Sequence, residues 1–411
     1  MRALRYGEPR VGPAPPVRDG VDAEVAASIL SQPVELCELD DPVVAHDDDV
    51  VCAPRLSGVC GSDARLLLGD FSDGDLDNPM AAFSPLPFVL GHEVVADVLD
   101  AGPAAVVAPG DRVVLDPWLA CAARRLAPCR ACVAGEHAQC ERFLDDGLGP
   151  GLHVGVSAGA PGAFATRLKA TASQLHRVPD GVDDAAAVLA DPFSVSLHAI
   201  TRTPPPQGGC ALVIGAGALG TTAVAVLRRW HPDTEVAVLC RHGHQRDAVR
   251  RLGAHLAVDH EPRDDALEAI CEFSGGVPRA ALQGLAMSYP GGVDVVYDTV
   301  GSAETLELAV RAGRVRGRVV LLGVATPRRF EWTPIYFKEL TVTGSSGFGH
   351  ETVAGVRRHA IDHYLAACED GLDLSWLVTH VEALDEWVEL CAAIADQGRS
   401  GVLKAAFAPQ R

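Results

Sequence analysis

The fold is decided by the stretch CALVIGAGALG, which spans residues 210–220. It opens with five apolar residues in a row, as in a buried strand of a parallel sheet. Gly215, Gly217 and Gly220 follow at G-x-G-x-x-G spacing and precede a predicted helix over 221–230. The first glycine allows a tight turn, the second lets a pyrophosphate approach the backbone, and the third lets helix and strand pack closely. The stretch therefore predicts a dinucleotide site at a helix N-terminus.

Strand and helix alternate downstream of this stretch, as they do in a doubly wound parallel sheet. Further strands are predicted at 235–239, 256–258, 293–298, 318–323 and 341–345. We therefore predict an α/β fold with a dinucleotide-binding domain over 196–344. The remaining residues, 345–411, are predicted to be helical from about Glu351. With the stretch at 402–404 they are expected to return to the domain formed by residues 1–195.

Residues 1–195 have a different pattern, in which short apolar runs alternate with Pro, Gly and Asp clusters. Strands are predicted at 34–37, 50–52, 94–99 and 111–115. This part is therefore expected to be an irregular β-rich domain. Its acidic stretch 70–78 is interpreted as a solvated loop, because it lacks the closing Glu of a calcium loop.

Composition limits the classes of protein to be considered. At 411 residues the chain is long enough for two domains, and its net charge of −19 argues against a nucleic-acid partner. No apolar run is long enough to span a membrane and no signal peptide is recognisable, so we expect a cytoplasmic protein. Its twelve cysteines are then thiols or metal ligands rather than disulfides.

Two short glycine-flanked segments bring together residue types that bind zinc. Cys60 and Ser62 lie in GVCGSD at 58–63, and His92 and Glu93 lie in GHE at 91–93. Thiolate, imidazole and carboxylate are the ligands of a catalytic zinc ion, which keeps one position open for water or substrate. The alternative is a buried Cys and a core His without a metal. The motifs downstream favour the zinc site.

Four cysteines form a second group with the spacing C-x7-C-x2-C-x7-C. They are Cys121, Cys129, Cys132 and Cys140. Four thiolates within twenty residues can close a tetrahedral structural zinc site, and the tight C-x2-C pair rarely arises by chance. Unpaired surface cysteines are the alternative, which is disfavoured because exposed free thiols are reactive.

The end of the second strand of the dinucleotide-binding domain carries a basic cluster. An NAD site usually has an acidic residue at this point, but Cys240 occupies the position. Arg241, His242, His244 and Arg246 follow it. A guanidinium binds a 2′-phosphate that a carboxylate would repel, so the sequence favours NADP(H) over NAD(H). A solvated basic loop is the alternative reading.

Taken together, these motifs resemble those of the zinc-dependent medium-chain dehydrogenase/reductase (alcohol dehydrogenase-like) superfamily. The resemblance covers nearly the whole chain and rests on GVCGSD, GHE, the four-cysteine segment 121–140, ADPFSVSLHAI at 190–200, VIGAGALG at 213–220, VDVVYDTVG at 293–301 and KEL with TVTGS at 338–345. It implies a GroES-like β-barrel catalytic domain, residues 1–195 and 345–411, interrupted by a Rossmann domain at 196–344.

The resemblance also implies roles for individual residues. Cys60 and His92 would ligate the catalytic zinc, and Glu93 would be a ligand or a carboxylate close to the metal. Ser62 would contact the substrate oxygen and relay its proton. The third ligand of the family aligns with Asp191. A hydride would pass between a nicotinamide and an alcohol or carbonyl, with zinc as the Lewis acid.

This chain departs from the pattern of the family at four places. Asp191 is one methylene shorter than the Glu of the polyol branch, so it binds zinc directly, through water or not at all. Arg65 replaces a proton-relaying His and cannot act as an acid–base group near neutral pH. Leu126 replaces the usual first cysteine of the four-cysteine segment, and we expect Cys121 to substitute for it. Residues 262–292 exceed the usual length and suggest an inserted surface segment.

We therefore expect a zinc-dependent oxidoreductase with two zinc ions per chain, NADP(H) as cofactor and a small alcohol or carbonyl substrate. A homodimer or homotetramer is expected, with no nucleic-acid or membrane partner. The alternatives are a non-catalytic nucleotide-binding or sensor protein on the same scaffold and a reductase of activated double bonds. Trp118, Phe83 and Phe88 are candidates for an apolar substrate pocket. The residues predicted to contact the cofactor are Gly215, Gly217, Leu219, Gly220, Cys240, Arg241, His242, Arg246, Val300 and Gly323.

Overall fold

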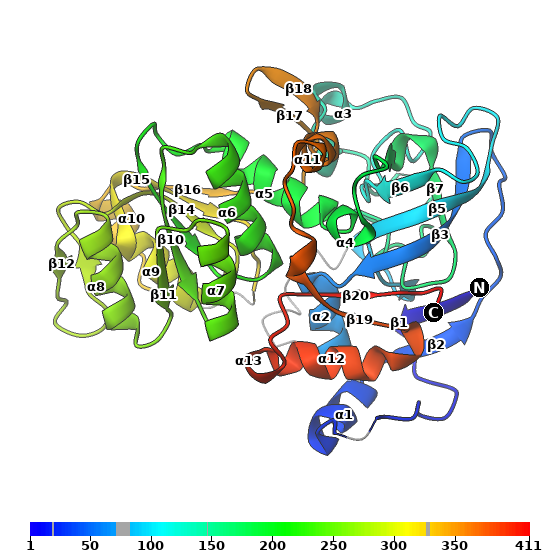
Figure 1. Ribbon diagram of the computed structural model, residues 1–411, viewed down its shortest axis with the longest axis horizontal. Helices are drawn as coiled ribbons and strands as arrows, with labels where there is room; N and C mark the ends of the chain where they lie inside the picture. Colours follow the sequence, from blue (N-terminus) through cyan, green and yellow to red (C-terminus); the bar gives the residue numbers. More distant parts are fainter. Residues whose placement is uncertain (19, 71–82, 146, 326–328) are drawn as a thin grey trace. The chain divides into compact units, whose positions relative to one another are not determined.

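The computed structural model describes residues 1–18, 20–70, 83–145, 147–325 and 329–411, and the chain divides into two compact units (Figure 1). The first unit contains the described residues up to Asp191 together with Ile361–Arg411, and the second contains Pro192–Ala360. The second unit includes the predicted dinucleotide-binding domain and continues beyond residue 344. Most of the acidic stretch 70–78 lies outside the described residues.

The second unit is built on a six-stranded sheet in the order β11-β10-β9-β14-β15-β16. The strands are β9 (Cys210–Ile214), β10 (Glu235–Cys240), β11 (Leu256–Asp259), β14 (Val293–Asp298), β15 (Gly313–Leu321) and β16 (Thr341–Gly344). All five pairings are parallel, and the strand order reverses direction between β9 and β14. The doubly wound parallel sheet is thus confirmed.

Helices connect these strands. They are α6 (Ala218–Trp230), α7 (Gly243–Arg251), α8 (Arg263–Phe273), α9 (Ala303–Ala312) and α10 (Thr333–Phe337), and α5 (Ala190–Arg202) precedes β9. Helix α6 begins three residues before the predicted start, with Gly217 as its N-cap. A Cβ atom on Gly220 would lie 2.0 Å from the carbonyl oxygen of Gly215, which itself has a φ of +90°. The glycine spacing is therefore what allows α6 to start so close to the end of β9.

The prediction of an inserted surface segment over 262–292 is wrong for its first half. Residues 263–273 form α8, and Ala266, Leu267, Ile270 and Cys271 of this helix are buried in the core of the unit. The remainder contains a short hairpin of β12 (Pro278–Arg279) and β13 (Met287–Ser288). Leu282, between the two strands, is fully exposed. The apolar face of α8 makes it one of the helices that cover the sheet.

The prediction of helix from about Glu351 is also wrong. This segment forms an antiparallel hairpin of β17 (His350–Val353) and β18 (Val356–His359), and helix α11 (Ala360–Glu369) begins only afterwards. Ala354 and Gly355 have φ values of +48° and +81°, which make the tight two-residue turn of a hairpin. In addition, Glu351 is held by α5, because its carboxylate accepts hydrogen bonds from His198 Nδ1 at 2.5 Å and Thr201 Oγ1 at 2.8 Å.

The first unit is β-rich, as predicted. Its main sheet has the order β19-β20-β3-β5-β6-β8, with β7 paired to β3, and a smaller sheet has the order β2-β1-β4. The strands are β1 (Arg2–Tyr6), β2 (Val34–Glu38), β3 (Asp49–Gly58), β4 (Phe88–Val89), β5 (Glu93–Ala101), β6 (Arg112–Leu115), β7 (Leu168–Thr171), β8 (Leu175–Arg177), β19 (Val378–Glu382) and β20 (Lys404–Phe407). The four predicted strands correspond to β2, β3, β5 and β6.

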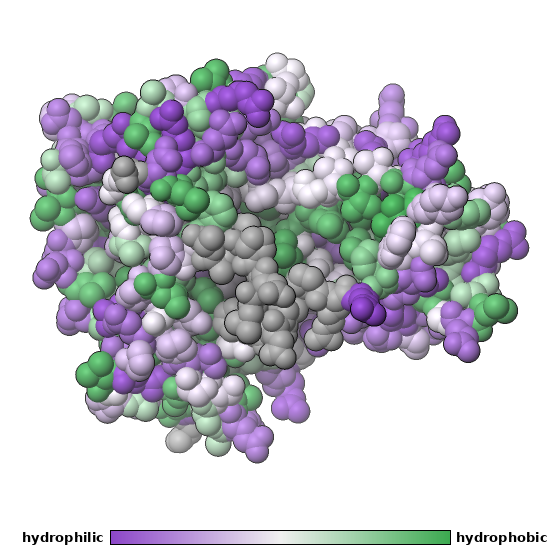
Figure 2. All heavy atoms as spheres, turned by 180° about the vertical axis from the view of Figure 1, so that it is seen from behind, coloured by the Kyte–Doolittle hydropathy of each residue, from purple (hydrophilic) through white to green (hydrophobic). Residues whose placement is uncertain are grey.

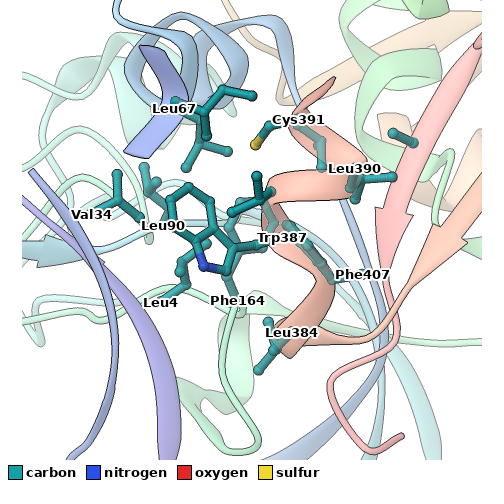
Figure 3. Close-up of a cluster of buried hydrophobic side chains, with 14 of the residues drawn as sticks. Leu4, Val34, Leu67, Leu90, Phe164, Leu384, Trp387, Leu390, Cys391 and Phe407 are labelled. Carbon is teal, nitrogen blue, oxygen red and sulfur yellow. The ribbon is translucent and has the colours of Figure 1, made fainter. Parts of the chain in front are cut away.

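Short helices complete this unit. They are α1 (Ala23–Leu30), α2 (Gly61–Leu68), α3 (Arg130–Ala134), α4 (Asp184–Ala187), α11 (Ala360–Glu369), α12 (Trp387–Ala395) and α13 (Gln397–Ser400). Trp387 on α12 is 1% exposed and lies at the centre of a core that joins distant parts of the chain (Figure 3). Its neighbours come from the start, the middle and the end of the sequence, among them Leu4, Leu90, Phe164 and Phe407. The C-terminal segment is therefore an integral part of the first unit.

Within the part of the chain that the structure describes, no helix has the length and apolar character of a membrane span.

Candidate metal centre and cofactor site

Strand pairing brings together the two segments that carry the predicted zinc ligands, residues 58–63 and 91–93. Gly58 at the end of β3 lies opposite Glu93 at the start of β5 in an antiparallel register. A Cβ atom on Gly58 would lie 2.4 Å from Glu93 Oε2, so only glycine leaves room for that carboxylate. Cys60 then caps α2, and its backbone N–H donates to Asp63 Oδ2 at 3.0 Å. The sequence GVCGSD thus directs its thiol toward the GHE segment.

The ligand atoms of Cys60, His92 and Glu93 all lie within 4.8 Å of one another. His92 is 6% exposed, and its Nδ1 lies 3.8 Å from Oδ2 of the buried Asp63. Burial opposes a charge on His92, but the nearby Asp63 and Cys60 hold the pKa of its imidazole well above the usual value. A buried imidazole that faces a thiol and a carboxylate lies where a positive charge is favoured, which is what a metal cation requires. The donor set therefore fits zinc.

Glu93 has a second partner besides this group. Lys404 Nζ, on the last strand, forms an ion pair with Glu93 Oε2 and donates to the carbonyl oxygen of Val59 at 2.9 Å. Both charged side chains are only 2% exposed. The carboxylate of Glu93 therefore lies between an ammonium group and the donors of Cys60 and His92. This contact was missed by sequence analysis, since Lys404 is 311 residues from Glu93 and belongs to no motif.

Asp191, the fourth predicted ligand, lies near this group but does not belong to it. It is 7% exposed in the first turn of α5 and interacts electrostatically with His92 and Glu93. Burial is the main reason why the pKa of its carboxyl is raised to about 7, and Glu93 adds to the effect while His92 opposes it. The structure thus brings three of the four predicted ligands together.

Ser62, the predicted proton relay, and Arg65, which replaces the relaying His of the family, both lie on α2. Ser62 is exposed in the first turn of this helix, two residues after Cys60. Arg65 is half-buried one turn later and donates from Nε to the carbonyl oxygen of Asp70 at 3.3 Å. Its guanidinium is thus bound to the end of the same helix.

His153 lies beside the group formed by Cys60, His92 and Glu93. Sequence analysis did not predict a residue at this position. Its ring centroid is 4.5 Å from that of His92, and its Nδ1 donates to the carbonyl oxygen of Val154 at 2.7 Å. The edge of the Trp118 ring lies against it, with centroids 5.7 Å apart. Burial, and secondarily His92, lowers the pKa of His153 to about 3, so its ring is neutral. A single His in a glycine-rich segment carries no motif that reveals this position.

The predicted apolar pocket residues divide into two groups. Trp118 contacts His153, and Phe83 packs with Trp118 in the small core of the four-cysteine segment. Phe88 is 4% exposed and stacks on Tyr6 in the main core, with ring centroids 5.9 Å apart. The prediction of Phe88 as a pocket residue is therefore wrong, because β4 pairs with β1 and directs this ring inward.

The four predicted thiols converge around one point. Cys121 Sγ lies 3.6 Å from Cys140 Sγ, which lies 3.9 Å from Cys129 Sγ, and all four sulfur atoms are within 4.8 Å of one another. Zinc–sulfur bonds of about 2.3 Å give a tetrahedron with edges of about 3.8 Å. Burial would raise the pKa of Cys129, but N–H donors and neighbouring thiols lower it to about 6. The arrangement fits zinc, with Cys121 in the place expected for it.

The buried side chain of Arg124 stabilises the four-cysteine segment through hydrogen bonds to the backbone on both sides of it. It is 5% exposed, and its guanidinium donates to five backbone carbonyl oxygens. The acceptors belong to Leu119, Phe143, Asp145, Gly149 and Gly151. Arg124 thereby joins the four-cysteine segment to the loop that leads to His153.

The predicted cofactor residues Gly215, Val300 and Gly323 meet at the carboxyl ends of three strands. A Cβ atom on Gly215 would lie 2.7 Å from Val300 Cγ2, and one on Gly323 would lie 2.4 Å from the carbonyl carbon of Val300. The ends of β9, β14 and β15 therefore approach one another closely only because glycines stand there. Gly217 has open space where a Cβ atom would be, and Leu219 lies in the first turn of α6. This is where dinucleotides bind in open α/β sheets.

The basic cluster lies between the end of β10 and the start of α7. Cys240 is fully buried, so its thiol offers nothing to a ligand, whereas Arg241 is exposed. The rings of His242 and His244 stack with centroids 5.5 Å apart. Arg246 forms an ion pair with Asp259 at the end of β11. Arg241 is therefore the best-placed cation for an anionic group.

Two family models match the chain. The model of the alcohol dehydrogenase GroES-like domain matches residues 46–180, and the model of zinc-binding dehydrogenases matches residues 218–361. The L-threonine 3-dehydrogenase of Anaeromyxobacter sp. (strain K) is 29% identical over 357 residues, which cover 86% of this chain and 89% of that protein.

Solved structures have the same fold. The alcohol dehydrogenase of the archaeon Aeropyrum pernix superposes with a TM-score of 0.73 at 22% identity, over the full length of both chains. A protein of Sinorhizobium meliloti 1021 whose structure holds NADP superposes with a TM-score of 0.70 at 25% identity, over 99% of both chains. The Rossmann and GroES-like folds are thus shown.

The chain belongs to the zinc-dependent medium-chain dehydrogenase/reductase superfamily, which is alcohol dehydrogenase-like. It is accordingly an oxidoreductase of the zinc-dependent alcohol dehydrogenase type.

The buried Glu93–Lys404 pair leads to a prediction for stability. Lys404→Met leaves the Glu93 carboxylate buried without its ammonium partner, so the free energy of unfolding should fall by about 3–5 kcal/mol in chemical denaturation. The double variant Lys404→Met/Glu93→Gln should recover part of this loss, because no uncompensated charge remains.

Lys169→Met is the matched control, since Lys169 is 39% exposed and lies 3.8 Å from Asp49. Its cost should stay below about 1 kcal/mol. Equal losses in Lys404→Met and Lys169→Met would contradict the importance of the buried pair.

Proposed function

We propose that this protein transfers a hydride between NADP(H) and an alcohol or carbonyl substrate at a zinc site formed by Cys60, His92 and Glu93. The observation that carries the proposal is the convergence of these three ligand atoms within 4.8 Å in a chain of this superfamily. A bound zinc ion would supply Lewis-acid catalysis toward the substrate oxygen, and the nicotinamide would supply or accept the hydride.

The residues of the chain provide positioning and proton transfer. Oδ2 of the buried Asp63 lies 3.8 Å from Nδ1 of His92, so its carboxylate favours a positive charge at this imidazole and at a metal ion next to it. Lys404 fixes Glu93 beside the two other donors. The exposed hydroxyl of Ser62 passes the proton of the substrate oxygen to water, since Arg65 cannot relay it.

We propose that Asp191 acts on the zinc ion through water. It is buried and close enough to influence His92 and Glu93, yet it stands outside the group of three. Its shorter side chain gives a physical reason for this difference from the Glu of the polyol branch. The four thiols of Cys121, Cys129, Cys132 and Cys140 would hold a second, structural zinc ion.

NADP(H) is the cofactor that the site favours. The buried Cys240 stands where an acidic residue would bind a ribose hydroxyl, and the exposed Arg241 follows it. A guanidinium at this point can bind a 2′-phosphate in bidentate fashion. The S. meliloti neighbour holds NADP, which is consistent with the proposal.

We propose a homodimer or homotetramer in which two copies meet at one surface of the second unit. Strand β16 is an edge of the sheet, and all four of its residues are exposed. Helix α10 and the residue before it expose aromatic side chains, with Trp332 at 60% and Tyr336 at 82%. Figure 2 shows hydrophobic residues gathered on part of the second unit. An uncovered edge strand beside apolar side chains is a surface that a second copy can cover.

We also propose a cytoplasmic location, in which the cysteines would serve as thiols and zinc ligands rather than in disulfides.

The zinc proposal predicts the metal content. The wild-type protein should retain close to two zinc ions per chain after loosely bound metal is removed. Cys60→Ala should lower this value by about one and abolish turnover without loss of folding, because the four-cysteine site remains. Elemental analysis and circular dichroism measure both effects.

Cys52→Ala is the control, because Cys52 is buried in β3 and belongs to neither group of ligands. It should keep two zinc ions. A wild-type value near one that Cys60→Ala does not change would contradict the catalytic site.

The cofactor proposal predicts a ratio of kcat/KM that favours NADP(H) over NAD(H) by about a hundredfold in the wild type. Arg241→Ala should reduce this ratio about tenfold or more, because it removes the charge that binds the 2′-phosphate. Arg250→Ala, on the helix α7 that follows Arg241, is the control and should leave the ratio unchanged. A wild-type preference for NAD(H), or an undiminished ratio in Arg241→Ala, would refute the assignment.

The assembly proposal predicts that Tyr336→Glu combined with Val342→Lys halves the mass of the particle in sedimentation experiments. The charges would prevent two copies from meeting at α10 and β16. A tetramer that becomes a dimer would equally support the interface. Val11→Lys, at a residue that is 89% exposed in the first unit, should change nothing. A wild-type monomer, or an unchanged mass in the double variant, would rule out this surface.

A further inference from the structure

A carboxylate lies beside the place where the ribose of the cofactor is expected, and the proposed function gives it no role. Asp259 ends β11, and in the parallel pairing of β11 with β10 it is the register partner of Cys240 (Figure 1). The backbone N–H of His260 also joins the two strands, because it donates to the carbonyl oxygen of Cys240 at 2.8 Å. Neighbouring strands lie about 4.8 Å apart. Asp259 is therefore adjacent to the position that carries an acidic residue in an NAD site.

Arg246 pairs with this carboxylate. Its Nη1 forms an ion pair with Asp259 Oδ1, and its Nη2 lies beside Gly243, the first residue of α7, where a Cβ atom would be 3.6 Å away. Both charges also act on the thiol of Cys240. Burial raises the pKa of this thiol to about 12, the charge of Arg246 opposes the effect and the charge of Asp259 adds to it. The ion pair thus flanks the expected position of the ribose 2′ group.

The ion pair is exposed enough for a ligand to rearrange it. The side chains of Arg246 and Asp259 are 30% and 53% exposed. An ion pair at this exposure contributes little to stability, because water screens both charges. A phosphate group carries more negative charge than a carboxylate and also binds a guanidinium in bidentate fashion. Arg246 can therefore turn from Asp259 to a 2′-phosphate at a small cost in free energy.

The same carboxylate affects the two cofactors in opposite ways. In an NAD site, the acidic residue at the end of the second strand accepts a hydrogen bond from the ribose 2′-hydroxyl. In this chain β10 ends in the buried Cys240, and the next strand supplies the carboxylate. The charge of Asp259 favours a hydroxyl donor and repels a phosphate. Arg246 balances this charge, so the ion pair leaves the site open to a 2′-phosphate.

We infer that Asp259 is a specificity-determining residue of the cofactor site, whose carboxylate lies next to the ribose 2′ group and limits the preference for a 2′-phosphate, while Arg246 offsets this effect. The inference rests on the proposed function, since the cofactor must bind at this edge of the sheet. It deepens that function, because Arg241 attracts the phosphate whereas Asp259 sets how far the attraction outweighs the binding of a 2′-hydroxyl.

The test measures binding of two probes that lack the nicotinamide, so that turnover plays no part. They are adenosine 2′,5′-bisphosphate and 5′-AMP, which differ by the 2′-phosphate. Calorimetric titration of the zinc-loaded protein gives the ratio of the affinity for the bisphosphate to that for 5′-AMP. Asp259→Asn keeps the size of the side chain and an acceptor oxygen for Arg246 but removes the charge, so this ratio should rise about tenfold. Arg246→Ala leaves the carboxylate uncompensated and should lower the ratio about tenfold or more.

The double variant Asp259→Asn/Arg246→Ala should bring the ratio back to within about threefold of the wild type, because both opposing charges are gone. Glu235→Gln is the matched control. Glu235 is an exposed carboxylate at the other end of β10, about 17 Å along the strand from Cys240. Because charges at this distance are screened, the ratio should stay at the wild-type value. Circular dichroism of each variant should match the wild type, since the substituted side chains are exposed or half-buried.

A ratio that Asp259→Asn leaves unchanged or lowers would overturn the inference, and a wild-type ratio well above one would at the same time leave the NADP(H) proposal standing. A wild-type ratio near one would refute the NADP(H) proposal, and the change caused by Asp259→Asn would still decide the inference. Binding of neither probe to the wild type would refute both.

Discussion

The antiparallel pairing of β3 with β5 is the constraint on which the proposed metal centre depends. It sets Gly58 opposite Glu93 and thereby joins two segments that lie more than thirty residues apart in the sequence. Because Gly58 has no side chain, the Glu93 carboxylate fits against the strand that leads to Cys60. A shift of one residue in this register would turn Glu93 to the other face of the sheet. The hydrogen bonds of the backbone therefore decide which functional groups meet.

The end of the chain completes the same centre. Strand β20 pairs with β3 and supplies Lys404, whose ammonium group is buried against Glu93 and the carbonyl oxygen of Val59. Trp387 anchors the preceding helix in a core shared with the first strand. The free energy gained from burying this large side chain offsets part of the desolvation cost of the ion pair. Packing at the C-terminus and the electrostatics of the site are thus coupled.

The second unit provides the proposed site for the anionic cofactor. Its parallel strands direct their carboxyl ends to one edge, where the glycines allow the backbone to approach closely, and its helices begin there. Helix N-termini and a basic turn after β10 can hold an anionic cofactor in a protein whose net charge is −19. These local positive groups therefore outweigh the repulsion between the cofactor and the net negative charge of the protein, because electrostatic interactions are screened beyond about 10 Å.

The sequence by itself determined the features that depend on local spacing. These are the glycine turn before α6, the strand and helix alternation, the four thiols and the two zinc-type segments, because each is written within a short stretch of chain. Tertiary structure decided the rest. The hairpin of β17 and β18 replaced a predicted helix where Glu351 meets His198, and α8 became a core helix. Phe88 turned into the core, whereas Lys404 and His153 came to lie beside Glu93 and His92, two of the proposed metal ligands. These outcomes depend on contacts between residues far apart in the sequence, and no local pattern encodes which distant partner a side chain will meet.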